Sequence, residues 1–465
     1  MTARESDLRA RFEGAGQAHV FDAWGELDEA GRRRLLDQLE GVDLELVRLH
    51  GRLAGASGAP PPAREIAPPD LFPLRRSPQQ EARAREAREL GEARLAAGKV
   101  GFVLVAGGQA SRLGYDGPKG AFPVGPVSGR SLFELHARRL RAARRRYGAA
   151  VFWYVMTSPA NDASTRRFFA EHEFFGLEPD LVLFFSQATN PALDFGGRIL
   201  MRSPGELFLA PNGHGGALLA MRRHGVLEHA RERGIEEFSY FQVDNPLARP
   251  ADPLFVGLHA AAGAGMSTKV VAKAHAAEKV GVLGKLDGRL GCIEYSDLPE
   301  ELRNARDASG ELTFRAGNIA LHVITRAFVE ELTRGGLKLP WHVARKTMSV
   351  SERGRLVERE GAKFETFVFD ALAHSPASVT LEVERALEFS PVKNASGEDS
   401  PATARAHLCR LHAGWAAAAG LELPRPGADE IHPVEVCPLV AEDEAGFLER
   451  RGIEPIATAR GHLYT

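Results

Sequence analysis

Apolar residues recur at a helical spacing over roughly the first 52 residues of the chain. The clearest run places charged residues between apolar positions that lie three or four residues apart: Leu35, Leu36, Leu39, Val42, Leu46 and Leu49. This spacing predicts amphipathic helices. The prolines, glycines and small residues over 54–70 predict an extended connector, and the polar stretch 79–98 predicts another helix.

From residue 100 onward, short apolar runs alternate with stretches of helical spacing. Val100–Val105 is short, apolar and rich in valine, which is typical of a buried strand. Ser131 and Glu134 form a capping-box pattern that predicts a helix to about Tyr147. The other predicted elements are strands over 151–157, 181–185 and 238–243, and helices over 161–175 and 215–225. This alternation predicts a largely parallel sheet with right-handed crossovers, in which ligands bind at the carboxyl ends of the strands.

After residue 265 the predicted strands follow one another more closely, over 267–274, 280–286 and 289–295. Short connections of this kind predict antiparallel strands added beside the first sheet. From residue 388 onward helical and short strand patterns mix, which predicts a small C-terminal α+β domain. We therefore expect an N-terminal helical segment with its linker over 1–95, a main α/β domain over 96–385 and a small domain over 386–465.

The charges of the chain nearly cancel, with 59 basic against 61 acidic residues among 465. This balance argues against general nucleic-acid binding, so any anionic ligand must meet a local group of cations. Cys292, Cys409 and Cys437 are far apart, which indicates buried thiols rather than a disulfide framework or a zinc site. No apolar run approaches the ~20 residues that span a bilayer, and no signal peptide is evident, so we expect a cytoplasmic protein that binds no membrane.

The stretch VLVAGGQASRLGYDGPKGAFPVG, residues 103–125, places a glycine-rich loop at the end of the first predicted strand. The loop is not a Walker A motif, because Pro118 precedes Lys119 and Gly120 follows it. It is not GxGxxG either, which argues against an NAD-linked oxidoreductase. Glycines nevertheless let backbone N–H groups approach an anion, while Arg112 offers phosphate a planar fork and Lys119 a point charge. The loop therefore indicates a phosphate site, and a tight strand-to-helix turn with two surface cations is the alternative.

The segment AGGQASRLGYDGPKG resembles the signature AGGxGTRLGxxxPKG of UDP-sugar pyrophosphorylases. The chain looks most similar to eukaryotic-type UDP-N-acetylhexosamine pyrophosphorylases, with UDP-glucose pyrophosphorylases as relatives. Further family motifs follow in order, among them FFSQATNPALDFGGRI, LAPNGHGG, FQVDNPLARPADP, RAGNIALH and EFSPVKNASGEDSPATAR, over roughly residues 70–440. The resemblance implies a Rossmann-like nucleotidyltransferase fold (GT-A-like), with a mixed sheet flanked by helices, and makes 96–385 the catalytic domain.

The family reaction joins UTP to a hexose 1-phosphate and releases pyrophosphate, by in-line attack of the sugar phosphate on the α-phosphorus of UTP. The nucleophile is already an anion near neutral pH, so catalysis should consist of positioning and charge neutralisation rather than general-base chemistry. The resemblance implies Mg²⁺ as cofactor at Asp244, since magnesium needs few protein carboxylates when phosphates and water complete its shell. We expect a monomer or weak oligomer.

The resemblance assigns a role to each of a set of residues. Nucleotide contacts fall to Ala106, Gly107, Gly108, Lys119, Gln187, Gly213, Asp244 and Lys363; catalytic roles fall to Arg112, Lys119 and Lys393; and sugar contacts fall to His214, Asn245, Glu294, Asn318, Phe367 and Phe369. Gln187 would pair with uracil, because an amide offers both a donor and an acceptor. Without the resemblance, the polar residues would be ordinary surface or turn residues and the two phenylalanines ordinary core.

Two residues depart from the family pattern. Ala110 replaces a loop glycine, and it would be strained if that position required a positive φ. His214 stands where N-acetylhexosamine enzymes usually carry Asn and UDP-glucose enzymes tend to carry His, whereas Phe367 and Phe369 match aromatic residues of the acetamide pocket.

Because of these two departures, the sequence does not determine which hexose 1-phosphate is the substrate. N-acetylglucosamine 1-phosphate is the preferred acceptor and glucose 1-phosphate the alternative. A non-catalytic nucleotide-sugar-binding protein on the same fold is a further alternative. It predicts loss of the charged site residues, all of which are present: Arg112, Lys119, Asp244 and Lys393.

Overall fold

The computed structural model describes residues 2–56, 65–295, 297–352, 354–424, 432–450, 452 and 454–465. Contacts within the chain define two compact units. The N-terminal unit comprises Met1–Ala63, Gln187–Ala217 and Lys338–Val368, and the sheet unit comprises Arg64–Ser186, Leu218–Leu337 and Phe369–Thr465. Of the connector predicted over 54–70, residues 57–64 lie outside the described residues.

Four parallel strands form the centre of the sheet unit. In spatial order they are β4 (Val182–Ser186), β3 (Trp153–Thr157), β2 (Val100–Val105) and β9 (Glu237–Gln242). Their register is set by pairs such as Phe102↔Trp153 and Phe102↔Ser239. All four strands were predicted from apolar runs, and the parallel arrangement is confirmed.

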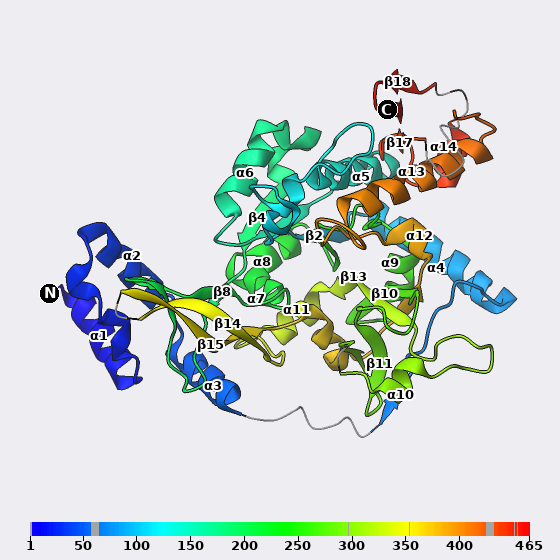
Figure 1. Ribbon diagram of the computed structural model, residues 1–465. Helices are drawn as coiled ribbons and strands as arrows, with labels where there is room; N and C mark the ends of the chain where they lie inside the picture. Colours follow the sequence, from blue (N-terminus) through cyan, green and yellow to red (C-terminus); the bar gives the residue numbers. More distant parts are fainter. Residues whose placement is uncertain are drawn as a thin grey trace. The chain divides into compact units, whose positions relative to one another are not determined.

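Antiparallel strands extend this sheet beyond β9. The strand β13 (Ala316–Thr325) pairs with β9. Both β10 (Met266–Ala272) and β11 (Val282–Leu286) pair with β13. Both β12 (Arg289–Ile293) and β1 (Ile66–Ala67) pair with β11. A short strand, β16 (Thr380–Glu382), adds parallel to β10. The resulting ten-stranded sheet has the main order β1-β11-β13-β9-β2-β3-β4, of which Figure 1 labels β11, β13, β2 and β4. The antiparallel addition expected after residue 265 is confirmed.

Helices connect and cover these strands. They are α4 (Pro78–Ala96), α5 (Leu132–Tyr147), α6 (Asp162–Glu171), α7 (Gly216–Arg223), α8 (Val226–Glu232), α9 (Pro253–Ala261), α10 (Glu300–Asn304) and α11 (Arg326–Leu332). Ser131 caps α5 by accepting the backbone N–H of Glu134, as the sequence predicts. Within the described ranges, no helix combines the length and the apolar character that crossing a membrane requires.

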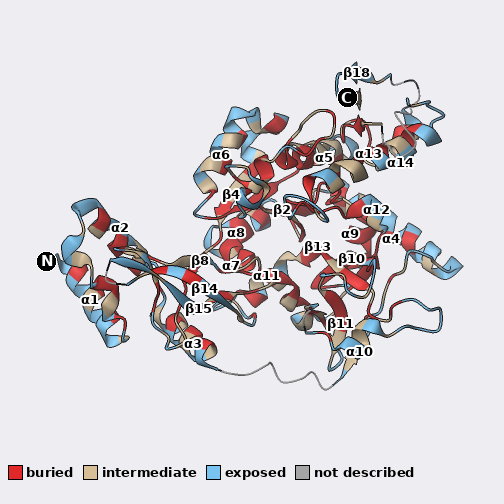
Figure 2. Ribbon diagram, in the orientation of Figure 1, coloured by how far each residue is buried: buried red, intermediate tan, exposed pale blue. Residues whose placement is uncertain are grey.

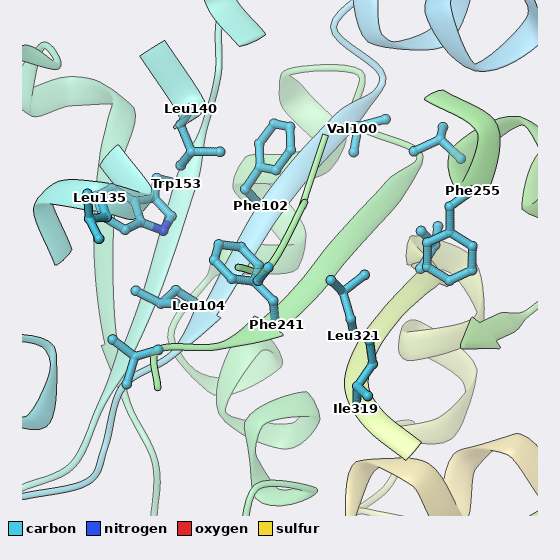
Figure 3. Packing of buried hydrophobic residues seen from close by; sticks show 14 of the residues in the cluster. Val100, Phe102, Leu104, Leu135, Leu140, Trp153, Phe241, Phe255, Ile319 and Leu321 are labelled. Carbon is cyan, nitrogen blue, oxygen red and sulfur yellow. The ribbon is translucent and has the colours of Figure 1, made fainter. Parts of the chain in front are cut away.

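Apolar side chains from the strands and from α5 fill the core of the sheet unit. Phe102 and Leu104 of β2 pack in one cluster with Trp153 of β3 and Phe241 of β9. Figure 3 shows Leu135 and Leu140 of α5, Phe255 of α9, and Ile319 and Leu321 of β13 around these strands. Strands β2, β3 and β9 are therefore buried on both faces, whereas β4 is only partly buried, and Figure 2 shows the buried colour through the centre of the sheet unit. Burial on both faces explains why their sequences are continuous apolar runs.

The C-terminal part of the sheet unit mixes helices with short strands, as predicted. Its elements are α12 (Arg385–Glu388), α13 (Pro401–Ala418), β17 (Val434–Val436), α14 (Glu444–Glu449), β18 (Ile456–Thr458) and β19 (Gly461–Tyr464). Glu435 of β17 accepts the backbone N–H groups of Val127 and Ser128 at 3.0 and 2.8 Å. This carboxylate therefore joins the C-terminal strands to the segment that follows the glycine loop.

The N-terminal unit combines helices with short antiparallel ribbons. Its helices are α1 (Ala3–Gly14), α2 (Glu29–Glu40) and α3 (Leu44–Gly55), and its ribbons are β5 (Thr189–Pro191) with β8 (Leu209–Pro211), β6 (Met201–Ser203) with β7 (Glu206–Leu207), and β14 (His342–Glu352) with β15 (Arg355–Glu365). Leu35 and Leu39 of α2 share one core with Leu193 and with Phe364 of β15. His50 of α3 stacks on Phe364, with ring centroids 4.0 Å apart. The N-terminal helices predicted from their leucine spacing are confirmed.

Candidate active site

The glycine loop leaves β2 and folds back on itself before α5 begins. Its two ends are joined by hydrogen bonds from Lys119 N to Gly108 O and from Ala110 N to Gly117 O, each 3.0 Å long. Two short 3₁₀ turns, η3 (Ser111–Leu113) and η4 (Lys119–Ala121), shape the loop. As a result Lys119 lies beside Gly108, although the two are far apart along the loop.

Ala110 is not strained in this loop. Its φ is −94° and its ψ is 16°, so the position does not require the left-handed region. The side chain is fully buried. The departure from the family glycine is therefore compatible with an ordinary loop backbone.

A lysine and an aspartate meet at the carboxyl ends of β2 and β9. Lys119 Nζ lies 3.1 Å from Asp244 Oδ2, and the two side chains are 19% and 12% exposed. The Asp244 carbonyl accepts the backbone N–H of Val392 at 2.8 Å, which places Lys393 next in the chain. Lys393 Nζ lies 3.6 Å from Asp399 Oδ2, and the Lys393 side chain is exposed. Three of the predicted residues are thus gathered at one edge of the sheet, and Arg112 is exposed on η3 of the same glycine loop.

Asn245 is buried beside this group, and its amide binds the backbone of the segment that carries Lys393. Its Nδ2 donates to Glu388 O at 2.7 Å, and its Oδ1 accepts from Ser390 N at 3.0 Å. The geometry shows Asn245 holding this segment in place. Its predicted contact with the sugar stays a prediction.

Glu294 and Asn318 lie close together around Gly281. A Cβ built on Gly281 would lie 2.9 Å from Cys292 Sγ and 3.7 Å from Glu294 Oε1. Asn318 donates its backbone N–H to Gly281 O at 2.9 Å, and its Nδ2 lies 3.8 Å from Cys292 Sγ. The structure therefore brings these two predicted sugar-binding residues together on β13 and the end of β12.

The cysteine prediction holds in part. Cys409 and Cys437 are buried, whereas Cys292 is only half-buried, and all three are free thiols. Burial, followed by the charge of Glu294, raises the pKa of the Cys292 thiol. Sequence reasoning missed Cys292 and Gly281 as neighbours of the candidate sugar residues, because only the folded hairpin places them there.

In the N-terminal unit, the backbone of Thr366 lies so close to Gly213 that a side chain at position 213 would collide with it. Gly213 has a φ of +82°, and a Cβ there would lie 2.4 Å from Thr366 O. Thr366 donates its N–H to Asn212 O, and Gly215 donates to Thr366 O, both at 2.8 Å. The PNGHGG turn is therefore fixed to the end of β15, a contact that the sequence does not reveal.

His214 is held in this turn against an aromatic ring. Its Nδ1 accepts the backbone N–H of Val368 at 3.2 Å, and its ring lies 5.3 Å from that of Phe367 in a stacked arrangement. His342 also packs on Phe367, at 4.5 Å. Burial, and then the nearby His342, lowers the pKa of His214 to about 4, so its imidazole is neutral at physiological pH.

The other predicted residues divide between the two units. In the N-terminal unit, Gln187 is buried at the start of the segment after β4. Lys363 on β15 has its ammonium 5.1 Å from the Phe208 ring, and burial lowers its pKa. Phe369 is buried in η7 (Val368–His374) and belongs to the sheet unit.

Asp244 is the predicted metal ligand, and its carboxylate lies beside Lys119 Nζ. Among the described residues, no group of three or more His, Cys, Asp or Glu side chains converges as a metal centre would require. A lone carboxylate suits Mg²⁺, which takes few protein ligands when phosphate oxygens and water supply the others. The single carboxylate is compatible with Mg²⁺ that arrives together with a polyphosphate, and magnesium binding stays a prediction.

A glycine loop, a lysine–aspartate pair and a second lysine at the carboxyl edge of an α/β sheet are the groups that a nucleotidyltransferase needs to bind phosphates. Comparison with known proteins supports this class. Residues 71–417 match the family described as UTP–glucose-1-phosphate uridylyltransferase. The human protein named UDP-N-acetylhexosamine pyrophosphorylase-like protein 1 is 38% identical over 481 residues, which cover 96% of this chain and 94% of the human one.

Two further relatives agree. UDP-N-acetylglucosamine diphosphorylase 2 of Arabidopsis thaliana is 37% identical over 93% of this chain and 89% of its own. The crystal structure of the uridine diphosphate N-acetylglucosamine pyrophosphorylase from Trypanosoma brucei, in complex with an inhibitor, superposes with a TM-score of 0.80 at 28% identity, over 97% of this chain and 95% of that one. The chain therefore belongs to the UTP–glucose-1-phosphate uridylyltransferase family, and it is a nucleotidyltransferase of the UDP-sugar pyrophosphorylase type.

Proposed function

We propose that the enzyme transfers the uridylyl group of UTP to N-acetylglucosamine 1-phosphate and releases pyrophosphate. The observation that carries this proposal is the meeting of Lys119, Asp244 and the Lys393 segment beside the glycine loop. The names of the relatives in the human and Arabidopsis proteomes support an N-acetylated sugar.

In this proposal, the chain contributes positioning and positive charge. The backbone at Ala106, Gly107 and Gly108 and the side chains of Arg112 and Lys119 bind the triphosphate, so that negative charge on the departing pyrophosphate is neutralised. Lys393 lies on the sugar phosphate and orients it for in-line attack. The phosphate oxygen is an anion already, and no residue has to remove a proton from it. Mg²⁺ held by Asp244 would screen the charges of the phosphate oxygens.

The base and the sugar are assigned to other residues. Gln187 pairs with uracil beside Gly213, and Lys363 contacts a phosphate. Glu294, Asn318 and Asn245 bind sugar hydroxyls. The acetamide methyl group favours an aromatic surface, which supports contacts with Phe367 and Phe369. His214, whose counterpart in UDP-glucose enzymes tends to be His, is the observation that keeps glucose 1-phosphate as the second candidate.

A substrate panel tests the proposal. The enzyme, UTP and Mg²⁺ are mixed with the 1-phosphates of N-acetylglucosamine, N-acetylgalactosamine, glucose and galactose, and pyrophosphate release gives kcat/KM for each. We expect N-acetylglucosamine 1-phosphate to give the highest value. A highest value for glucose 1-phosphate would favour the alternative, and no pyrophosphate with any sugar would indicate a non-catalytic nucleotide-sugar-binding protein.

We further propose a cytoplasmic enzyme that is a monomer or weak oligomer and takes UTP and a hexose 1-phosphate as its partners. The near-neutral charge balance supports small anionic ligands rather than nucleic acid. Sedimentation of the purified chain at several concentrations measures the oligomeric state, and a stable dimer at all of them would contradict this expectation.

A further inference from the structure

The backbone between β2 and η3 is bonded through three successive carbonyl oxygens to two side chains that follow β3. Asn161 donates its Nδ2 to Ala106 O at 2.8 Å and to Gly108 O at 3.2 Å. Ser158 Oγ donates to Gly107 O at 2.8 Å. The carbonyls of Ala106, Gly107 and Gly108 are therefore tied to the same small polar group.

Ser158 and Asn161 are themselves buried and fixed. They are 2% and 1% exposed. Asn161 Oδ1 accepts the Ser158 N–H at 2.8 Å and lies 3.0 Å from Ser158 Oγ. Asn161 occupies the N-cap position of α6, where an asparagine ordinarily accepts N–H groups of its own helix, but among the described residues its side chain makes no such bond. This side chain serves the loop instead of the helix.

The direction of the carbonyl groups determines the direction of the N–H groups. In a planar trans peptide the C=O and the following N–H point to opposite sides. The three tied carbonyls therefore turn the N–H groups of Gly107, Gly108 and Gln109 away from Ser158 and Asn161. Within the described chain these three N–H groups have no protein acceptor, and the residues are half-buried to exposed. Consecutive N–H groups that point the same way form an anion-binding nest.

We infer that Ser158 and Asn161 are positioning residues that orient three consecutive N–H groups of the loop toward the phosphates of the nucleotide. The inference rests on the proposed function and adds two residues that the family motifs do not assign to the site. Donors that are oriented before the ligand arrives stabilise its charge without reorganisation of the loop. Loss of either side chain would release one or two peptide groups to rotate.

The test compares the affinity for a phosphate probe with the affinity for a nucleoside. Calorimetry on the full chain with Mg²⁺ measures the Kd of inorganic pyrophosphate and of uridine for wild type, Asn161→Ala, Ser158→Ala and the control Ser164→Ala. Ser164 lies on the same helix, and its hydroxyl bonds the Asn161 carbonyl rather than the loop. We expect pyrophosphate affinity to fall about tenfold in Asn161→Ala and several-fold in Ser158→Ala. Each variant lets loop N–H groups turn away from the anion, which weakens their hydrogen bonds to a charged ligand. Uridine affinity should match that of wild type in all three variants, and the control Ser164→Ala should also keep the pyrophosphate affinity of wild type.

The outcomes separate this inference from the proposed function. Unchanged pyrophosphate affinity in both variants overturns the inference, and so does an equal loss of uridine affinity, which would report general disruption. If Asn161→Ala does not fold, Ser158→Ala decides by the same criteria. UDP-sugar synthesis by wild type is measured in parallel. An inactive wild type whose pyrophosphate affinity depends on Asn161 refutes the proposed enzyme but supports the orienting role.

Discussion

Lys119 Nζ lies 3.1 Å from Asp244 Oδ2, although 125 residues separate them in sequence. The parallel pairing of β2 with β9 explains this proximity, because the loop that carries Lys119 and the residue after β9 both lie at the carboxyl edge. The cation proposed to bind phosphate and the proposed metal ligand are thereby held at the same place. Charge neutralisation at this edge is the chemistry that uridylyl transfer needs.

Lys119→Ala and Asp244→Ala should each lower kcat by about 10²–10³-fold, the usual cost of removing one preoriented charge-stabilising group. Melting temperatures should fall while both variants stay folded, because the two side chains are only 19% and 12% exposed and each variant leaves one charge without its partner. Steady-state pyrophosphate release and thermal melts check both statements. Lys285→Ala, which removes the exposed pair with Asp70 at 2.7 Å, is the control. Turnover like that of wild type in either site variant would refute the assignment.

Gly257→Ala should destabilise the sheet unit, because α4 and α9 touch through their backbones. A Cβ on Gly257 would lie 1.6 Å from Ala87 O, and one on Gly91 would lie 1.8 Å from Pro253 O. Overpacking of this kind lowers the free energy of unfolding by about 3 kcal/mol. Gly414→Ala is the matched control, since nothing lies within 4 Å of its Cβ position on α13, and it should add ~0.5–1 kcal/mol. Urea unfolding measures both, and equal stability of the two variants would contradict the close contact.

The sequence predicted β2, β3 and β9, which are buried on both faces, because short continuous apolar runs such as Val100–Val105 are typical of such strands. It did not predict β13, although that strand is mostly buried too. It did not predict β16, whose three residues form a strand only through pairing with β10. The β14–β15 ribbon was missed because its apolar alternation is confined to short stretches, such as Met348 with Val350 and Ala362 with Phe364, among many charged positions. The chain segments around it join the N-terminal helices through tertiary contacts, which local patterns do not encode.

At the candidate site, the residue types of the glycine loop were enough to predict a phosphate site. The residues that contact this loop are set by the fold and could not be predicted. The pairing of Lys119 with Asp244 follows from strand order. Position 213 needs a glycine because the backbone of Thr366, which is distant in sequence, lies against it. Asn161 could not be found from spacing, because an asparagine before a helix ordinarily predicts only a cap.

Glu435→Ala should lower the free energy of unfolding by about 2–4 kcal/mol. The Glu435 carboxylate is 1% exposed and accepts bonds from Val127 N, Ser128 N and Ser128 Oγ, the last at 2.6 Å. Its removal leaves these donors without their acceptor, which costs ~1–3 kcal/mol for each buried group. Denaturant unfolding measures the change, and the exposed Glu444→Ala is the control. Equal stability of the two variants would show that Glu435 does not hold this segment.

Stability should fall as the pH is lowered below about 6.5, because several histidines are buried in the neutral form. Burial lowers the pKa of His136 to about 3 and that of His259 to about 3. Between these values and about 6.5 the unfolded chain binds protons that the folded chain does not, so each histidine removes ~1.4 kcal/mol per pH unit. Above this window both states are neutral and the contribution is complete.

His136→Gln tests this origin of the pH dependence. The His136 ring bonds Val243 O at 3.0 Å, and glutamine can donate the same bond without titrating. We expect the slope of unfolding free energy against pH to decrease by ~1.4 kcal/mol per unit between pH 6.5 and 4.5, with no change above pH 7. The exposed His172→Gln serves as control. An unchanged slope in His136→Gln would mean that this histidine is already protonated in the folded protein.

His214→Asn should shift the enzyme toward the N-acetylated sugar. Asparagine can still accept the Val368 N–H that now reaches His214 Nδ1 at 3.2 Å, but it removes the ring stacked on Phe367 at 5.3 Å. The freed aromatic surface favours the acetamide methyl group over a bare hydroxyl, so the ratio of kcat/KM for N-acetylglucosamine 1-phosphate to that for glucose 1-phosphate should rise about tenfold.

His342→Asn is the matched control, because His342 packs on the same Phe367 ring at 4.5 Å but matches no sugar contact. A rise in His214→Asn alone assigns the selection to that side chain. Equal rises in both variants would assign it to the freedom of the Phe367 ring, since each variant removes one of its neighbours. An unchanged ratio in His214→Asn would show that His214 does not distinguish the two sugars. Glu294 and Asn318, which lie together around Gly281, would then be the next residues to test for the choice between acetamide and hydroxyl.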